Sequence, residues 1–272
     1  MKDEIAKLAR AEATGIITAD VAARAWATDR NAASRRLAAL ARGGWLRRLQ
    51  RGTYEVAALE SSSDVPASYE DPWALAGVLF APCYIGGWSA AEHWGLTEQL
   101  FRETFVITAA HVRTTRTVVG GAAFRLARVT PEKARGDSSV WRRTTRVACS
   151  SPERTLVDGA NIPSWVGGVR HLTDILARYV ELPSRNLEAL GTALKEVGRG
   201  AAAKRLGFIA EELAVGERDA EAHAALLAVR DMALSFRTSG VVRLDPAVSR
   251  HGPMNTHWGL WVNVRVAREA HS

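Results

Sequence analysis

Seven arginines lie within one short stretch near the start of the chain, and Asp29 is the single acid between residues 29 and 51. The planar guanidinium group presents several N–H donors, a geometry that matches phosphate oxygens and the acceptor edge of guanine. Asparagine forms a similar two-pronged hydrogen bond with adenine, and Asn31 lies among these arginines. These residue types therefore predict binding to duplex DNA.

We divide the candidate contact residues into two groups. The group assigned to base edges consists of Arg30, Asn31, Ser34 and Arg35. The group assigned to phosphates, or to the minor groove at a hairpin tip, consists of Arg36, Arg42, Arg47, Arg48 and Arg51. The alternative for each residue is simple solvation of the surface, and Arg36, at the edge of an apolar stripe, best suits a structural role.

A helix and a two-stranded hairpin are the elements that must position these side chains. The apolar residues that recur at helical spacing are Ala33, Leu37, Leu40 and Ala41. Gly43 and Gly44 supply the left-handed geometry that ends a helix. Residues 45–56 then form two short strands around a turn at residues 50–52. A helix that fits the major groove, followed by an arginine-tipped hairpin, predicts a winged helix-turn-helix.

Two more helices are expected upstream, over about residues 3–13 and 20–27, with Thr18 as the N-cap of the second. Ile16 and Ile17 are interpreted as a short apolar link between them. Three helices and a hairpin predict a complete DNA-binding domain over residues 1–59.

The rest of the chain predicts a larger domain. The acidic, Ser-rich segment 60–71 is expected to be a linker, and residues 72–272 a mixed α/β domain, so the predicted fold class is α+β. Helices are expected from residue 72, near residue 89, from residue 152 and throughout 166–230. Strands are expected at 83–85, 104–108, 112–128, 146–150, 235–244 and 257–266.

The net charge of +7 is unevenly placed. Residues 1–60 and 102–148 are basic, whereas residues 61–101 contain five acids and no lysine or arginine. The second basic block suits either nucleic acid or a solvated surface, because Arg outnumbers Lys 31 to 5 over the whole chain. Without a long apolar run or a signal core, neither a membrane span nor secretion is expected, and two widely separated cysteines suit the cytoplasm.

No catalytic, metal or cofactor site is expected from the motifs. Residues 87–91 nearly match a nucleophile elbow, but Ala91 replaces the second glycine, and Ser89 is better explained as a helix cap with Glu92. A nucleotidyltransferase would need paired carboxylates on a strand, whereas residues 219–221 lie in a helical region. The Glu-x-Lys and Asp-x-Lys motifs of metal-dependent nucleases are absent from the sequence.

The order of several motifs resembles the AbiEi family of antitoxins. The winged-helix segment ending in RRLQRGTYEV is followed by YIGGWSAAEHWGLTEQ, ETFVIT, SSPERTLVDG and HWGLWVNV. The family belongs to AbiE-type toxin–antitoxin systems, usually classed as type IV, which act in phage resistance. The resemblance covers nearly the whole chain, and the motifs within residues 85–99 and 151–158 are its most specific part.

The resemblance implies a non-enzymatic, cytoplasmic protein with two tasks. The N-terminal domain would bind inverted repeats in its own promoter and repress the operon. The C-terminal domain would counter a nucleotidyltransferase-like toxin, by direct or indirect contact. The protein would be a monomer that binds DNA cooperatively.

Two alternatives remain open from the residues themselves. One is a winged-helix transcriptional regulator whose C-terminal domain senses a ligand or dimerises. The other is an enzyme acting on nucleic acid or nucleotides, with the winged helix as its targeting module. Convergent carboxylates in a cleft would favour the enzyme, and loss of toxin rescue on coexpression would favour the regulator.

Overall fold

The structure, a computed structural model, describes residues 2–11, 15–56, 71–142, 145–198, 200–249 and 252–266. The chain divides into two compact units, one made of residues 1–84, 102–135 and 139–148, the other of residues 85–101, 136–138 and 149–272. The predicted domain 72–272 therefore has parts in both units. The predicted linker 60–71 lies outside the described residues, except for Asp71. Over the described ranges, no helix combines the length and the apolar character needed to cross a membrane.

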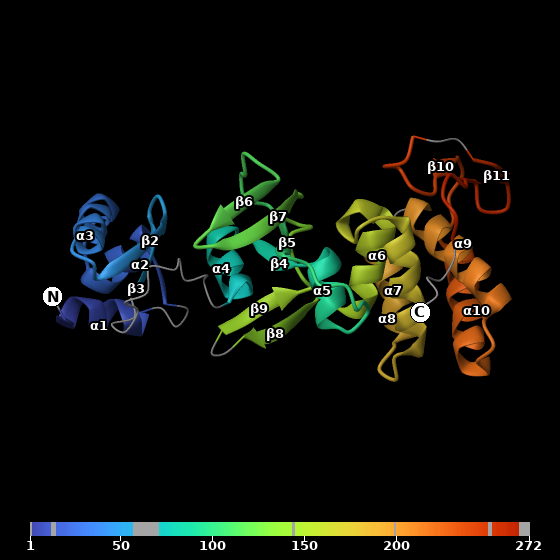
Figure 1. Ribbon diagram of the computed structural model, residues 1–272, viewed down its shortest axis with the longest axis horizontal. Helices are drawn as coiled ribbons and strands as arrows, with labels where there is room; N and C mark the ends of the chain where they lie inside the picture. The colour runs from blue at the N-terminus through green and yellow to red at the C-terminus, as the bar shows by residue number, and fades with distance from the viewer. Residues whose placement is uncertain are drawn as a thin grey trace. The chain divides into compact units, whose positions relative to one another are not determined.

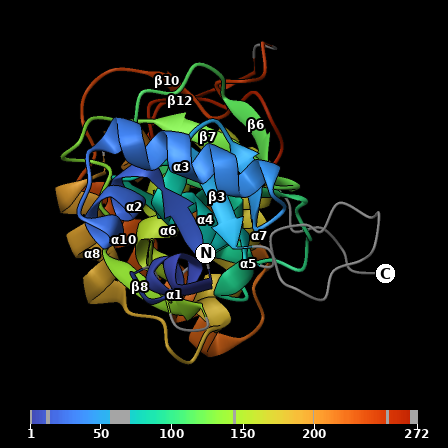
Figure 2. The same ribbon diagram turned by 90° about the vertical axis from the view of Figure 1, so that its left-hand side faces the viewer.

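The first three helices and the first three strands form a winged helix-turn-helix, as predicted (Figure 1). In chain order they are α1 (Lys2–Ala11), β1 (Ile16–Thr18), α2 (Ala19–Trp26), α3 (Arg30–Arg42), β2 (Leu46–Gln50) and β3 (Thr53–Val56). The strands pair antiparallel in the order β1-β3-β2, so the β2–β3 hairpin is the wing. Leu8, Ile17, Leu37 and Tyr54 lie in the small apolar core that these elements enclose. In Figure 2, α3 lies across α2 on the side that faces the viewer.

Two details of this part correct the sequence analysis. Ile16 and Ile17 were expected to be an apolar link, but with Thr18, the predicted N-cap of α2, they form β1, in which Ile17 pairs with Tyr54. A strand of three residues is too short to show an alternating pattern, and its pairing partner lies far along the chain, so the sequence around β1 does not predict it. At the end of α3, Gly44 has a positive φ of 77°, whereas Gly43, the C-cap, has an ordinary φ of −82°.

A six-stranded mixed sheet follows the winged helix in sequence. Its strand order is β6-β7-β5-β4-β9-β8. The strands are β4 (Cys83–Ile85), β5 (Glu103–Thr108), β6 (Arg116–Val119), β7 (Ala122–Arg128), β8 (Ser138–Arg142) and β9 (Thr145–Cys149). Strands β5 and β7 run parallel, β6 and β7 antiparallel, and β4 and β9 parallel. Strand β8 was not predicted from the sequence, because it is an edge strand in which Val140 is the one buried residue.

Helix α4 (Pro72–Leu79) begins where Asp71-Pro72 predicted a helix start. The side chain of Asp71 accepts hydrogen bonds from the backbone N–H groups of Trp73 and Ala74, at 3.0 and 3.3 Å. Pro72 at the first helical position costs nothing, because its missing N–H would have no partner within the helix.

The second unit is mostly helical. Its helices are α5 (Gly87–His93), α6 (Pro152–Asn161), α7 (Val169–Glu181), α8 (Leu187–Glu196), α9 (Gly200–Gly216) and α10 (Ala220–Ser235), with a short 3-10 turn, η1 (Pro163–Trp165). One apolar core joins α6 to α10, and Tyr179, Leu206 and Trp258 are among its fully buried members. The continuous helical pattern over residues 166–230 correctly predicted α7 to α10.

Two strands predicted near the C-terminus, over residues 235–244 and 257–266, are much shorter in the structure. Residues 235–244 and 257–266 contain only the two-residue strands β10 (Val242–Arg243) and β12 (Leu260–Trp261), which form a small sheet with β11 (Met254–Asn255). The alternating pattern is interrupted because Asn255 Oδ1 accepts the N–H of Trp258 at 2.9 Å, and Gly259 has a φ of 64°. A turn therefore occupies part of the expected strand.

The proposed cap of α5 was also wrong. Gly86, not Ser89, is the N-cap, and no side chain caps the helix. Ser89 is instead the third residue of α5 and is buried. Gly95, with a φ of 69°, follows the end of this helix as expected.

Candidate nucleic-acid interface

Helix α3 begins at a strong cap and buries one face. Oδ1 of Asp29 accepts the backbone N–H groups of Asn31 and Ala32, at 2.8 and 2.9 Å. These hydrogen bonds, above all the one from Ala32, lower the pKa of Asp29. Ala33, Leu37 and Leu40 are buried, which leaves the opposite face of the helix open to solvent. The cap and the apolar stripe together fix which side chains of α3 point outward.

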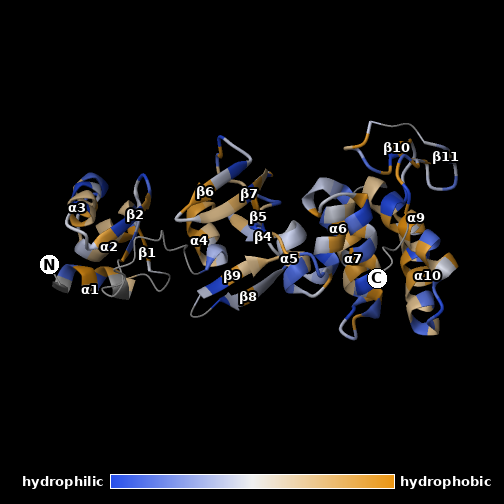
Figure 3. Cartoon of the chain, in the orientation of Figure 1, coloured by the Kyte–Doolittle hydropathy of each residue, from blue (hydrophilic) through white to orange (hydrophobic). Residues whose placement is uncertain are grey.

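A hollow of about 560 Å³ lies between the exposed face of α3, the start of α2 and the wing. Five of the nine predicted contact residues line it: Arg30, Asn31, Ser34, Arg48 and Arg51. Figure 3 shows hydrophilic residues along α3 and at the outer end of the β2–β3 hairpin. The hollow thus brings helix residues assigned to base edges together with wing residues assigned to phosphates.

The electrostatics of this hollow are cationic. Three arginines line it against one acid, Asp20. Oδ1 of Asp20 lies 3.1 Å from Nε of Arg30, and both side chains are mostly exposed. An exposed pair of this kind contributes little, because water screens it. Nε of Arg48 donates to the carbonyl of Gln50 at 3.4 Å, and among the described residues the terminal nitrogens of its guanidinium group have no hydrogen-bond acceptor.

Two predicted contact residues are instead held by acids of the same unit. Arg36 forms an ion pair with Glu4 of α1, and its guanidinium carbon lies 4.7 Å from the ring centroid of Trp26. Arg47 donates to Oε2 of Glu55, its cross-strand partner, from Nε at 2.9 Å and from Nη2 at 2.5 Å. These contacts give both arginines a role in holding the winged helix together.

The last two predicted residues, Arg35 and Arg42, are exposed on α3 but do not line the hollow. Arg35 lies close enough to Asp29 to contribute to the lowering of that carboxyl's pKa. Arg42 lies in the last turn, and its Nε donates to the carbonyl of Ala38 at 3.4 Å. A cation at this end of a helix also complements the helix dipole.

A comparison with solved structures finds a match over almost the whole chain. The crystal structure of the RV2827C protein from Mycobacterium tuberculosis matches with a TM-score of 0.54, covering 94% of this chain and 88% of that one. The two proteins share a fold. Their sequence identity is 18%, so the likeness to RV2827C concerns the fold and not the activity. No protein-family model and no curated protein matches the chain.

Sequence reasoning missed several residues that line the hollow. Asp20 was absent from the predicted set, although an acid in the first turn of α2 is readable from the sequence. Thr53 and Tyr54 also line it from the wing, while most of each side chain is buried. The sequence pattern of β3 does not indicate that these two residues line the hollow, because their place there depends on how the hairpin packs against α3.

The polar residues of the SSPERTLVDG motif serve as structural links in the second unit. Nε of Arg154 lies 3.0 Å from Oδ1 of Asp158, one turn further along α6, and both are buried. Oε1 of Glu153 accepts the hydroxyl of Tyr179 at 3.1 Å and the N–H of Asn186 at 3.2 Å. Burial and the nearby Glu153 carboxylate raise the pKa of Tyr179. The motif thus connects α6 with α7 and with the start of α8.

The carboxylates of residues 219–221 lie at the start of α10. Asp219 caps α10 by accepting the N–H of Ala222 at 2.8 Å, so residues 219–221 do not form a strand-borne pair. Within the described ranges, no three His, Cys, Asp or Glu side chains are grouped as a metal site requires.

Proposed function

We propose that the chain binds duplex DNA through α3 and the β2–β3 wing. The observation that supports this most directly is the cationic hollow lined by Arg30, Asn31, Ser34, Arg48 and Arg51. Side chains on α3 would reach base edges in the major groove, and the wing arginines would contact phosphates. Arg36 and Arg47, which are paired with acids, would orient these elements.

We further propose that the protein is the antitoxin of an AbiE-type operon and acts in the cytoplasm. It would repress its own promoter through the winged helix and counter a nucleotidyltransferase-like toxin through the remainder of the chain. The order of the sequence motifs supports this proposal, and the DNA-binding hollow is compatible with the repressor task. The proposal includes no catalytic residue, metal or cofactor.

A paired assay in cells tests both tasks. The gene is expressed with a reporter under its own upstream sequence, and separately with the product of the neighbouring gene. We expect the wild type to repress the reporter and to rescue growth from the neighbour's toxicity. Arg48→Ala should weaken repression and leave rescue intact, and Arg218→Ala, an exposed change in the second unit, should alter neither. Failure of rescue by the wild type would contradict the antitoxin task, and unchanged repression by Arg48→Ala would count against DNA binding through the wing.

The second candidate function is a transcriptional regulator whose C-terminal region senses a ligand. A cationic hollow around Lys204 in the second unit favours it. Repression that changes when a small ligand is added, without any rescue from a toxin, would support this function over the first.

A further inference from the structure

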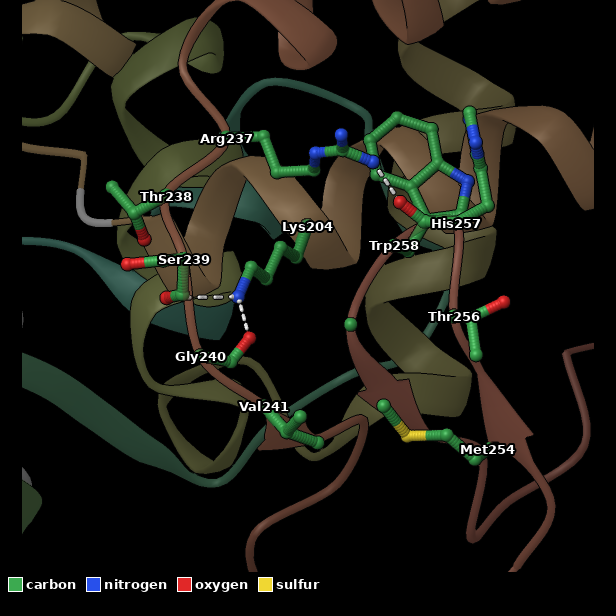
Figure 4. A pocket seen from close by; sticks show the side chains of 11 residues that line it. Lys204, Arg237, Thr238, Ser239, Gly240, Val241, Met254, Thr256, His257 and Trp258 are labelled. Carbon is green, nitrogen blue, oxygen red and sulfur yellow. Dashed lines mark hydrogen bonds between the residues drawn. The ribbon is translucent and has the colours of Figure 1, made fainter.

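A second cationic hollow, of about 440 Å³, lies wholly within the second unit (Figure 4). One side is formed by Lys204 of α9, another by residues 237–241 after α10, and a third by Met254 and residues 256–259 around the turn before β12. Its volume falls in the range of about 300–1,000 Å³ that is typical of small-molecule sites. No carboxylate side chain is among the described residues that line it.

Lys204 is almost completely buried, at 2% exposed. Its Nζ donates to the carbonyl oxygen of Gly240 at 2.5 Å and to that of Ser239 at 3.4 Å, as Figure 4 shows. An ammonium group has three donors, and within the described residues these two carbonyls occupy two of them. Gly259 has a φ of 64°, and a Cβ at this position would lie 2.8 Å from the carbonyl oxygen of Gly240 and 3.3 Å from Nζ, so the chain passes close to the ammonium group only because this residue is glycine.

Arg237 supplies the second positive charge. One of its terminal nitrogens donates to the carbonyl oxygen of His257, while the side chain as a whole is exposed. The hydroxyl-bearing side chains around the same hollow are those of Thr238, Ser239 and Thr256. Guanidinium, ammonium and hydroxyl groups are the donors that proteins commonly offer to phosphate oxygens.

The positive charges of Lys204 and Arg237 are hydrogen-bonded to neutral backbone carbonyls, and no carboxylate among the described lining residues neutralises them. Backbone carbonyls satisfy hydrogen-bond donors, yet they carry no net charge to offset two cations. Burial, and next the positive charge of Arg237, lower the pKa of Lys204. An anion bound in the hollow would act in the opposite direction, because a nearby negative charge stabilises the charged ammonium group and offsets the repulsion between the two cations.

We propose that this hollow binds the dianionic phosphate group of a small phosphomonoester. The two cations match the charge of about −2 that such a group carries near neutral pH. A phosphodiester carries a single charge and has fewer oxygens free for the donors of Lys204 and Arg237. Met254 and Val241 supply apolar surface at the opposite end of the hollow from Arg237, where the organic part of the ligand would lie (Figure 4).

Isothermal titration calorimetry on the full chain at constant ionic strength tests the proposal. The ligands are inorganic phosphate, adenosine monophosphate and dimethyl phosphate. We expect saturable binding of the first two, and binding of dimethyl phosphate that is weaker by about tenfold or more. Arg237→Gln should weaken phosphate binding by about tenfold, and Lys204→Met should weaken it further. The matched control, Arg218→Gln, is also exposed in this unit but lies outside the hollow, and it should bind like the wild type.

Three outcomes would overturn the proposal. They are the absence of saturable phosphate binding, equal affinity for dimethyl phosphate, and an Arg237→Gln variant that binds as tightly as Arg218→Gln. Because Arg237 is exposed, its variant remains informative if Lys204→Met fails to fold. The proposal specifies the ligand of the second candidate function, but its failure would leave DNA binding untouched, since the two hollows share no residue.

Discussion

Oδ1 of Asp20 lies 3.1 Å from Nε of Arg30, so the one carboxylate at the proposed DNA-binding hollow is paired with an arginine assigned to a base edge. The side chains are 62% and 73% exposed, respectively, and water screens their attraction. In a complex with DNA, Asp20 would repel nearby phosphates and compete for Arg30. We therefore expect Asp20 to lower the affinity for DNA, and a single substitution at this residue tests that expectation.

Asp20→Asn should tighten binding to duplex DNA by about threefold at low salt. The substitution removes a negative charge from the hollow and releases Arg30. Fluorescence anisotropy with a labelled duplex of the upstream sequence measures the change. Asp231→Asn, an exposed change in the second unit, is the matched control and should leave affinity unchanged. Weaker binding by Asp20→Asn would show that the Asp20–Arg30 pair positions Arg30 productively.

Arg36→Ala should lower stability more than DNA affinity. The substitution removes the ion pair with Glu4 and the contact with Trp26, together worth about 1 kcal/mol of unfolding free energy. Urea denaturation measures the loss, and anisotropy at a temperature where the variant is folded measures affinity. Should the variant keep wild-type stability and lose DNA affinity, Arg36 would belong with the DNA contacts instead.

The cap of α3 predicts a pH dependence. The folded-state pKa of Asp29 is lowered from its ordinary value of 3.8, so its stabilising effect is fully present above that value and is lost as pH falls through the lower folded-state pKa. Asp29→Ala should therefore reduce the melting temperature at neutral pH, and the difference from the wild type should shrink in acid. Asp29→Asn retains the capping oxygen and serves as the control. A difference that stays constant with pH would contradict this role.

Arg205 is the buried side chain whose loss should cost most in the second unit. Its Nη1 donates to the carbonyl of Ala160 at 2.7 Å, and its Nε to that of Leu244 at 2.9 Å. Arg205→Met would leave these buried carbonyls without their donors and should destabilise the protein by about 3 kcal/mol or more. Chemical denaturation measures the change, with the exposed Arg218→Met as the comparison. A loss below about 1 kcal/mol would mean that water replaces the guanidinium group.

The winged helix was readable from sequence because its signals are local. Helical spacing of Leu37 and Leu40 predicted α3, and the turn at Gly52, where φ is 80°, predicted the wing. By contrast, β1 exists because Ile17 pairs with Tyr54, and the expected strand near Trp258 is interrupted by a turn at Asn255. Composition and periodicity do not specify the long-range pairing of Ile17 with Tyr54, whereas the turn at Asn255 is local and was overlooked in favour of the alternating apolar residues that predicted a strand.

The candidate site was predictable in composition but not in detail. The density of arginines pointed to α3 and the wing, and of the arginines predicted there, Arg30, Arg48 and Arg51 do line a common hollow. The sequence could not show that Arg36 is held by Glu4, because the two residues lie on separate helices. The pairing of Arg47 with Glu55 likewise depends on the register of the hairpin. Charge density therefore overestimates the number of arginines available to DNA.

The central claim is that α3 and the wing grip duplex DNA, and the salt dependence of binding tests it most directly. Anisotropy with the upstream duplex, titrated over a range of salt concentrations, gives the slope of log affinity against log salt. Arg48→Ala should weaken binding to all duplexes and reduce the slope by about 1, whereas Asn31→Ala, an uncharged residue of the hollow assigned to a base edge, should cost about 1–3 kcal/mol on the preferred sequence with the slope unchanged. Absence of salt-sensitive binding by the wild type, or identical slopes for wild type and Arg48→Ala, would contradict the central claim.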